Sequence, residues 1–189
     1  MTQDGYSIAQ LVADLKRIRA EAADEHHLLA AVRPLALRAA ESRELWLDDR
    51  MFTPDREQGF SVYPLSEEED HSLAVFALSW LPDRGTPPHD HGTWSAVAGV
   101  VGSEWNTFWR RQDDGSRPGY AKLEQIGAKM FLPGEVLAMP AGTIHQVWNQ
   151  SAAVTVSLHI YGMHINHTGR SQFDAKNNTS QPYITRIAT

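Results

Sequence analysis

Two histidines one residue apart, His89 and His91, follow Pro87-Pro88 and come directly before a run typical of a β-strand. Residues two apart on an extended chain point to the same side, so the two imidazoles converge. A third histidine, His145, begins a later short strand in a segment where Gly and Pro shape turns. Three imidazoles suit Fe, Cu, Ni or Zn and leave positions open on the ion for a substrate and O₂. These residues therefore predict a mononuclear metal site, with Zn-bound water and hydrolytic or hydration chemistry as the rival.

A second polar pattern lies on residues 156–162. Ser157, His159 and Tyr161 fall on one face of this predicted strand, and Val, Leu and Ile fall on the other. Such alternation is also typical of any half-exposed strand. Because a metal site is expected nearby, we interpret the polar face as a hydrogen-bonded relay and the apolar face as core packing.

Composition limits the classes of ligand. The 189 residues include no cysteine, so any transition metal must be held by His, Asp or Glu. The formal net charge of −6 gives no reason to expect nucleic acid or an anionic membrane as partner. No run approaches the ~18 apolar residues of a membrane span, and the N-terminus lacks a signal-peptide pattern. We expect a cytoplasmic protein with a small-molecule ligand, and the sequence does not predict its oligomeric state.

Helical periodicity is confined to the N-terminal part of the chain. Apolar residues recur every three or four positions from Ser7 to about Glu21, which predicts an amphipathic helix. A second helical stretch covers roughly 24–42, and Pro34 is expected to break or kink it. Two or three helices are therefore expected in residues 1–45, as an extension packed on a barrel formed by 46–189. The whole chain, 1–189, is interpreted as one domain.

The remaining sequence consists of short runs rich in Val, Phe, Trp, Tyr and Thr, separated by Gly, Pro and Asp. Such runs predict antiparallel strands. They lie at about 59–63, 71–80, 93–101, 104–111, 120–125, 128–132, 135–139, 144–149, 152–161 and 181–187. We expect a mainly β fold, a sandwich or closed jelly-roll barrel with the helices on one side. Residues 174–180 are expected to form a polar loop.

The segment around His145 resembles a known motif. Gly134, Pro140, Gly142, His145 and Asn149 fit the pattern G-x5-P-x-G-x2-H-x3-N at every defined position. This pattern is the second signature motif of the cupin superfamily. The resemblance implies a cupin double-stranded β-helix.

The first cupin motif is only partly present. It usually continues from His-x-His to a Glu ligand, but Ser95 and Ala96 occupy the corresponding positions. Three histidines without a carboxylate resemble the thiol dioxygenase branch, which contains cysteine dioxygenase and 3-mercaptopropionate dioxygenase. Trp80-Leu81-Pro82 before the histidine pair, and Trp94 after it, are similar to the mercaptopropionate type.

This resemblance implies Fe(II) held by the three histidines, and oxidation of a small mercapto acid by O₂ to a sulfinic acid. Ser-x-His-x-Tyr is the triad beside the iron in that family. By resemblance, Tyr161 hydrogen-bonds dioxygen or the substrate carboxylate, His159 fixes the phenol and Ser157 fixes the imidazole. The Cys–Tyr cross-link of animal-type cysteine dioxygenases is excluded, because the chain has no cysteine.

The substrate is less well defined. Arg170, nine residues after Tyr161, has a spacing similar to an arginine of the mercaptopropionate type and is a candidate carboxylate anchor. The family also has Arg or Gln on an early strand, where an ungapped count finds Val62 beside Tyr63. This departure allows a different mercapto acid, such as mercaptosuccinate, or a larger thiol.

Other functions are compatible with the same fold. A different metal-dependent cupin dioxygenase, isomerase or lyase is one alternative, and a non-catalytic cupin that binds a small acid is another. Zn or Ni is an alternative to Fe(II) as the metal in purified protein. His164 and His167 lie in a predicted loop, and a second metal site there is a minor alternative.

Overall fold

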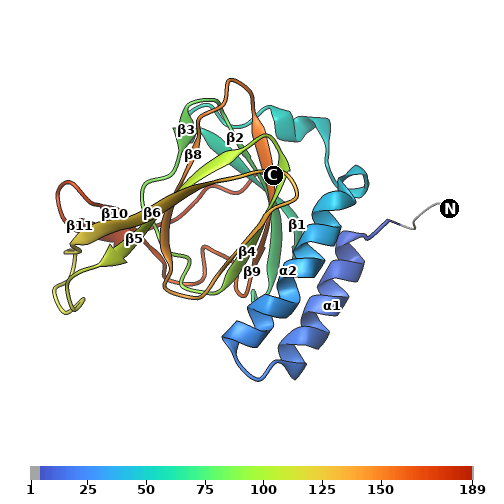
Figure 1. The fold of residues 1–189 in the computed structure, drawn as a ribbon, viewed down its shortest axis with the longest axis horizontal. Helices are drawn as coiled ribbons and strands as arrows, with labels where there is room; N and C mark the ends of the chain where they lie inside the picture. The colour runs from blue at the N-terminus through green and yellow to red at the C-terminus, as the bar shows by residue number, and fades with distance from the viewer. Residues whose placement is uncertain (1–4, 189) are drawn as a thin grey trace.

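Two antiparallel sheets face each other, and two helices cover the outer face of the larger one (Figure 1). The computed structural model describes residues 5–188. The larger sheet has the order β1 (Phe60–Glu67), β2 (Ala74–Trp80), β9 (Thr155–Tyr161), β4 (Ser95–Val101), β7 (Val136–Met139). The smaller sheet has the order β3 (Arg84–Gly85), β8 (Ile144–Asn149), β5 (Glu104–Arg111), β6 (Leu123–Phe131). A hairpin of β10 (Ser171–Asp174) and β11 (Thr179–Pro182) follows.

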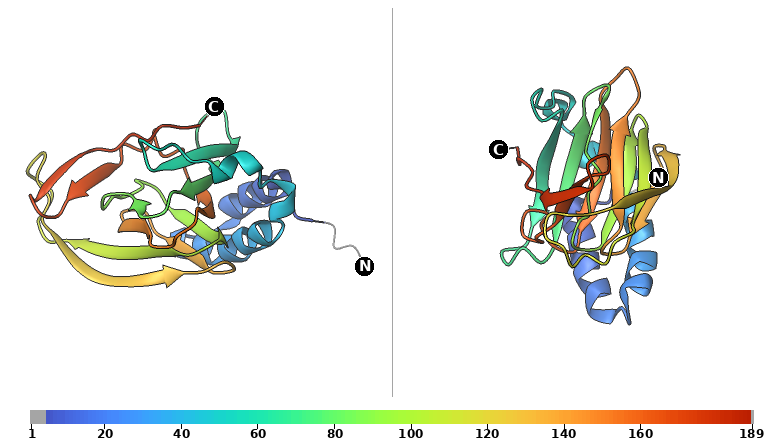
Figure 2. Two further views of the ribbon diagram at one scale, coloured as in Figure 1. Left: turned by 90° about the horizontal axis from the view of Figure 1, so that it is seen from above. Right: turned by 90° about the vertical axis from the view of Figure 1, so that its left-hand side faces the viewer.

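The chain winds between the two sheets from β4 onward. In the larger sheet β4 pairs with β7 and β9, and in the smaller sheet β5 pairs with β6 and β8. All of these pairs are antiparallel. This is the winding of a double-stranded β-helix, so the predicted mainly β jelly-roll fold with N-terminal helices is confirmed. The two turned views in Figure 2 show the helices on one side of the barrel.

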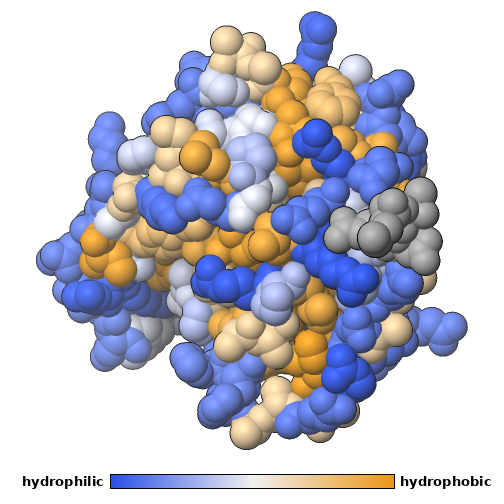
Figure 3. Space-filling model, turned by 45° about the vertical axis from the view of Figure 1, so that its right-hand side comes forward, coloured by the Kyte–Doolittle hydropathy of each residue, from blue (hydrophilic) through white to orange (hydrophobic). Residues whose placement is uncertain are grey.

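The helical elements are α1 (Ile8–Glu21), α2 (Glu25–Glu41), and the short 3-10 turns η1 (Arg43–Leu45) and η2 (Asp49–Phe52). Helix α1 begins with a capping box between Ser7 and Gln10, which satisfies free amide groups at the helix start. The helices bury their apolar sides against the larger sheet and leave polar residues over much of the face seen in Figure 3. No helix in the described part of the chain is both long and apolar enough to span a membrane.

Two sequence-based predictions of strand boundaries were wrong, and of the break or kink expected at Pro34 the break does not occur. Helix α2 continues through Pro34, because Pro34 and Ala30 are exposed and water can solvate the carbonyl that proline leaves free. Residues 120–125 and 128–132 contribute to one strand, β6, where a bulge opposite Phe108 and Trp109 accommodates the extra residue near Gly127. The expected strand at 181–187 ends at Pro182, since a proline cannot donate its share of ladder hydrogen bonds.

Further differences concern the ends of the chain and the segment 174–180. That segment contains the β10-β11 turn together with the first residues of β11, so it is not wholly a loop. The single domain inferred for 1–189 includes residues 1–4 and 189, which lie outside the described residues.

The two faces of strand β9 border different surroundings: one packs toward the helices and the other faces the barrel interior. Leu158 and Ile160 belong to the core cluster shared with the helices, whereas Tyr161 belongs to the cluster inside the barrel. All seven residues of β9 are buried. Its polar face is therefore turned toward the barrel interior and not toward solvent, unlike that of a half-exposed strand.

Candidate metal centre

The backbone itself brings the three predicted ligands together. His89 and His145 form an isolated antiparallel bridge, with amide-to-carbonyl distances of 2.8 and 2.9 Å. His91 follows two residues after His89 and points to the same side, as its spacing predicts. The ring centroids lie 5.2 Å apart for His89 and His91, 4.7 Å for His89 and His145, and 4.9 Å for His91 and His145. This group can hold a metal ion.

Each imidazole is oriented through its Nδ1 atom. His89 Nδ1 lies 3.0 Å from the carbonyl oxygen of Pro87, and His91 Nδ1 lies 2.9 Å from the hydroxyl of Ser95. His145 Nδ1 lies 3.0 Å from Asn106 Oδ1. A carbonyl oxygen can only accept, so His89 and His145 each carry their proton on Nδ1, which leaves Nε2 free as a ligand.

The Nε2 atoms face one another. Those of His91 and His145 are 3.1 Å apart, a separation that two ligands of one ion can adopt. The side chains are 4%, 3% and 1% exposed for His89, His91 and His145. Burial lowers the pKa of His145 to about 3 and lowers the pKa values of His89 and His91 well below the usual range. All three rings are neutral at pH 7, as metal ligation requires.

The relay residues on β9 lie beside this group. Ser157 Oγ is 2.8 Å from His159 Nε2, and His159 Nδ1 is 2.8 Å from the phenol oxygen of Tyr161. The Tyr161 ring packs edge-on against His91 at 5.0 Å. Burial raises the pKa of Tyr161 above its usual range and lowers the pKa of His159 to about 3. The chain of hydrogen bonds therefore consists of neutral groups and ends next to a candidate ligand.

Arg170 is 5% exposed and is not a surface arginine. Its Nε donates to the carbonyl of Tyr183 at 3.2 Å, its Nη2 donates to the hydroxyl of Thr185, and its guanidinium stacks 4.3 Å from the Tyr183 ring. No carboxylate among residues 5–188 forms an ion pair with it. Burial lowers the pKa of Arg170, and the phenols of Tyr161 and Tyr183 and the nearby carboxyl of Asp90 act in the opposite direction.

A small cavity joins these groups. Its polar lining consists of Thr86, His89, His91, His145, His159, Tyr161, Arg170, Tyr183 and Thr185. Its apolar lining consists of Phe60, Val62, Leu78, Trp80, Val147 and Ile165. Val62, which the sequence analysis found where an Arg or Gln was expected, forms part of the wall. The cavity volume is about 20 Å³, enough for little more than one water molecule.

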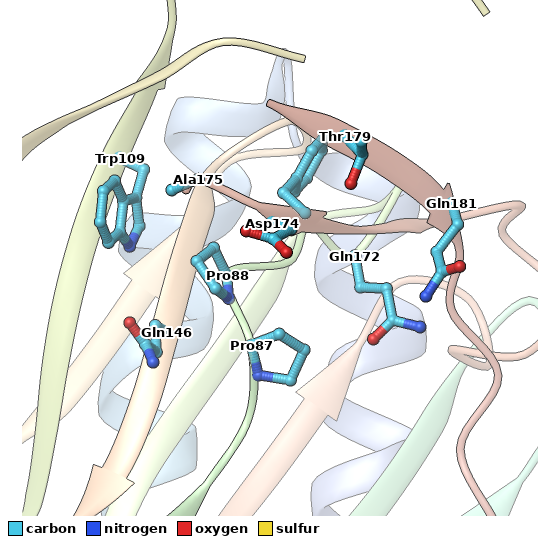
Figure 4. Close-up of a pocket in the computed structure, with 10 residues that line it drawn as sticks. Pro87, Pro88, Trp109, Gln146, Gln172, Asp174, Ala175, Thr179 and Gln181 are labelled. Atoms are coloured by element: carbon cyan, nitrogen blue, oxygen red, sulfur yellow. The ribbon is translucent and has the colours of Figure 1, made fainter. Parts of the chain in front are cut away.

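A larger hollow of about 490 Å³ lies outside the barrel, next to the β10-β11 hairpin (Figure 4). Pro88 and Gln146 line it, and each is the immediate neighbour of a candidate ligand. Its lining includes no histidine.

Several site residues were missed by the sequence reasoning. Asn106 on β5, and Tyr183 and Thr185 after β11, carry no spacing signal that links them to the histidines. Ser95 had been noted only as the residue in place of the usual Glu ligand, whereas it is a hydrogen-bond partner of His91.

A second histidine cluster lies near the surface. His164, His167 and Glu67 have potential ligand atoms within 4.8 Å of one another, and His71 contacts Glu67 at 2.5 Å. However, His164 Nδ1 accepts the amide of Asn166 at 3.1 Å. The ring proton must then lie on Nε2, which removes that atom as a ligand. We therefore do not assign a metal site to this cluster.

No family model matches the chain. Its structure is similar to that of an uncharacterized conserved protein with a double-stranded β-helix domain from Klebsiella pneumoniae, with 11% identity and a TM-score of 0.46 over 67% of this chain and 93% of that one. A cupin superfamily protein from Desulfitobacterium hafniense has 17% identity and a TM-score of 0.42 over 58% and 83%. Recombinant oxalate oxidase in complex with glycolate has 16% identity and a TM-score of 0.43 over 56% and 52%.

These neighbours are described as cupin or double-stranded β-helix proteins or as oxalate oxidase, and none of the three is named as a thiol dioxygenase. The matched region spans about half of that oxalate oxidase, 52% of its length. At these identities the likeness does not extend to activity.

Asn106→Ala is expected to weaken metal binding by about 10- to 100-fold, because His145 would lose the partner that fixes its ring orientation and tautomer. The measurement is a competition titration of the metal against a chelator. Asn177→Ala, on the exposed turn between β10 and β11, is the matched control and should bind like the unchanged protein. Equal affinity of both variants would show that the Asn106 amide does not support the ligand.

Proposed function

We propose that this chain is a mononuclear non-haem iron thiol dioxygenase that converts a small mercapto acid and O₂ to a sulfinic acid. The observation that carries the proposal is the combination of three neutral histidines, without a carboxylate ligand, and a buried Ser157–His159–Tyr161 chain that ends beside them. Oxygen chemistry with a bidentate substrate needs open positions on the metal, and a three-imidazole set leaves them. His89, His91 and His145 would hold Fe(II) through Nε2.

Bound there, Fe(II) would supply the redox chemistry that joins O₂ to sulfur. The protein groups would supply position and charge. Tyr161, kept protonated by burial, can donate its hydroxyl hydrogen bond into the cavity. His159 positions the phenol through its hydrogen bond with the Tyr161 oxygen, and Ser157 positions the imidazole of His159.

Arg170 is the reason to propose that the substrate carries an acidic group. Its guanidinium is buried in the cavity wall and forms no ion pair within residues 5–188. The nearby carboxyl of Asp90 offsets part of its charge, and an anionic ligand in the cavity would compensate the rest. A planar guanidinium can bind a carboxylate by two parallel hydrogen bonds. The small cavity volume disfavours a bulky thiol, and Val62 contributes an apolar group to the wall.

The test is oxygen consumption by metal-free protein reloaded with Fe(II), against cysteine, 3-mercaptopropionate, mercaptosuccinate, cysteamine and bulkier thiols. We expect uptake of one O₂ for each thiol with a short mercapto acid, and little uptake with cysteamine, which has no carboxylate to meet Arg170. Protein reloaded with Zn(II) is the control and should consume no O₂. Absence of uptake with every thiol, with iron shown to be bound, would overturn the proposal and favour another cupin reaction.

A further inference from the structure

The metal-site cavity is closed in this structure. Its volume of about 20 Å³ holds little more than one water molecule, and each of the three candidate ligands is at most 4% exposed. A mercapto acid, or any other ligand larger than water, therefore cannot reach His89, His91 and His145 unless part of the cavity wall moves.

Most of the wall is firmly attached to the barrel. Strands β1, β2, β8 and β9 form much of it, and β2 pairs along its whole length with β1 on one side and β9 on the other. His89 exchanges two backbone hydrogen bonds with His145. Ile165 and Arg170, on the segment between β9 and β10, are both buried. Moving the strands would require breaking ladder hydrogen bonds inside the barrel.

Residues 183–188, which we call the strap, form a different part of the wall. The strap follows β11, contains no strand, and crosses from the β10-β11 hairpin to β1, as the red end of the chain in Figure 2 shows. Tyr183 and Thr185 line the cavity and are buried, whereas Ile184 between them is 68% exposed. The strap therefore covers the cavity with alternate side chains and lies at the protein surface.

Backbone hydrogen bonds tie the two ends of the strap. The amide of Tyr183 donates to the carbonyl of Arg170 at 3.0 Å, and the amide of Ala188 donates to the carbonyl of Val62 at 2.8 Å. Pro182, directly before the strap, has no amide hydrogen to donate to a neighbouring strand. The ladder of the hairpin thus ends where the strap begins.

The middle of the strap is held by side-chain amides. The Asn166 amide donates to the carbonyl of Thr185 at 2.8 Å and accepts the Thr185 backbone amide at 3.0 Å. The Gln58 amide binds the backbone of Arg186 in the same way, at 3.3 and 3.0 Å. Exposed ion pairs of Arg186 contribute little, because water and salt screen them. Segments held by such solvent-accessible hydrogen bonds are the ones that open locally.

The strap is also linked to the charged group in the cavity wall. Within the described residues, both hydrogen-bond acceptors of the Arg170 side chain lie on the strap: Nε donates to the carbonyl of Tyr183 at 3.2 Å, and Nη2 donates to the hydroxyl of Thr185. Lifting the strap would free these donors, which can bind an anionic group. The same movement would thus open the cavity and make its positive charge available.

We propose that the strap is the gate of the metal-site cavity. Ligands reach the histidines when residues 183–188 lift from the barrel, and the amides of Asn166 and Gln58 determine how often this happens. Entry precedes any chemistry at the site, so the gate holds for whichever reaction the site supports.

The first experiment locks the strap. Glu57→Cys/Arg186→Cys replaces two side chains that form an ion pair at 3.0 Å, and a short bifunctional methanethiosulfonate can join the two cysteines, since the chain has no other. Diethylpyrocarbonate, which is larger than water and modifies neutral imidazoles, is the probe of access in the full-length metal-free protein. We expect the cross-link to slow modification of His91 and His145 by about 10-fold or more, because labelling follows the population of the open state. The measurement is mass spectrometry of the histidine-containing peptides.

Three controls accompany the locked protein. His26 and His27 are exposed on α2, so their modification rates should not change. Glu57→Cys treated with the same reagent has no cross-link and should be modified like the unchanged protein. Reductive cleavage of the cross-link, followed by gel filtration, should restore the modification of the cavity histidines. Equal modification of these histidines with and without the cross-link would overturn the proposal.

The second experiment loosens the strap. Asn166→Ala removes two hydrogen bonds to Thr185, and we expect His91 and His145 to be modified about 5- to 150-fold faster. Asn177→Ala, on the exposed turn between β10 and β11, is the matched control and should show no change. Gln58→Ala takes the place of Asn166→Ala if that variant does not fold, and should act in the same direction.

Equal rates in the folded loosened variant and in Asn177→Ala would contradict the role of the amides and overturn the proposal. Neither experiment requires bound metal, a thiol or O₂. Failure of the gate is therefore distinguishable from failure of the proposed function.

Discussion

His91→Ala is expected to leave a folded protein that no longer retains a metal ion. The change removes one of three Nε2 donors, and affinity should fall by more than about 100-fold, because altering a group that merely orients a ligand already costs 10- to 100-fold. His91 is buried, and its Nδ1 partner is Ser95. Loss of that hydrogen bond should lower the free energy of unfolding by about 1–3 kcal/mol, within the range a domain of this size tolerates.

The measurement is metal content by mass spectrometry after reloading with one equivalent of Fe(II) and gel filtration, together with thermal unfolding. His26→Ala, on the exposed side of α2, is the control and should retain the metal. Retention of a full equivalent by folded His91→Ala would exclude this histidine as a ligand.

Arg170→Met should lower kcat/KM for the mercapto acid by about 30- to 4000-fold, mainly through KM, because truncating one partner of a buried charge pair costs about 2–5 kcal/mol. Methionine keeps much of the apolar contact with Tyr183 but removes the donors. Any residual turnover of cysteamine, which lacks a carboxylate, should change far less.

Comparing thiols with and without a carboxylate distinguishes loss of carboxylate binding by Arg170 from general damage to the structure. Arg186→Met, at an exposed ion pair with Asp55 and Glu57, is the matched control and should leave both substrates unaffected. An equal loss for thiols with and without a carboxylate would assign Arg170 a structural role through Tyr183 and Thr185.

The parts of the site that were predictable from sequence depend on local geometry. His89 and His91 converge because alternate residues of an extended chain share a side, and Ser157, His159 and Tyr161 share a face for the same reason. The prolines and glycines around His145 mark the turns that start β8. Such spacing rules need no knowledge of tertiary structure. The cupin form of the barrel and the meeting of His145 with the histidine pair were instead implied by the resemblance of residues 134–149 to the second cupin motif.

The remaining features depend on contacts between distant parts of the chain. Asn106 reaches His145 across the β5-β8 pairing, and nothing near Asn106 in sequence distinguishes it from another polar residue on a strand. Burial of Arg170 depends on how the segment after β11 folds back over it. Pro34 was expected to break or kink a helix, and α2 is not broken there, because local rules do not include the packing that holds α2 against the sheet.

The most direct test of the central claim is the source of the oxygen atoms in the product. Fe(II)-loaded protein is incubated with the mercapto acid that supports the fastest uptake, under ¹⁸O₂ in unlabelled water, and the product is identified by mass spectrometry. We predict a sulfinic acid in which both added oxygen atoms are ¹⁸O. A disulfide, or a product carrying oxygen from water, formed by protein with iron bound to His89, His91 and His145 would contradict the assignment as a thiol dioxygenase.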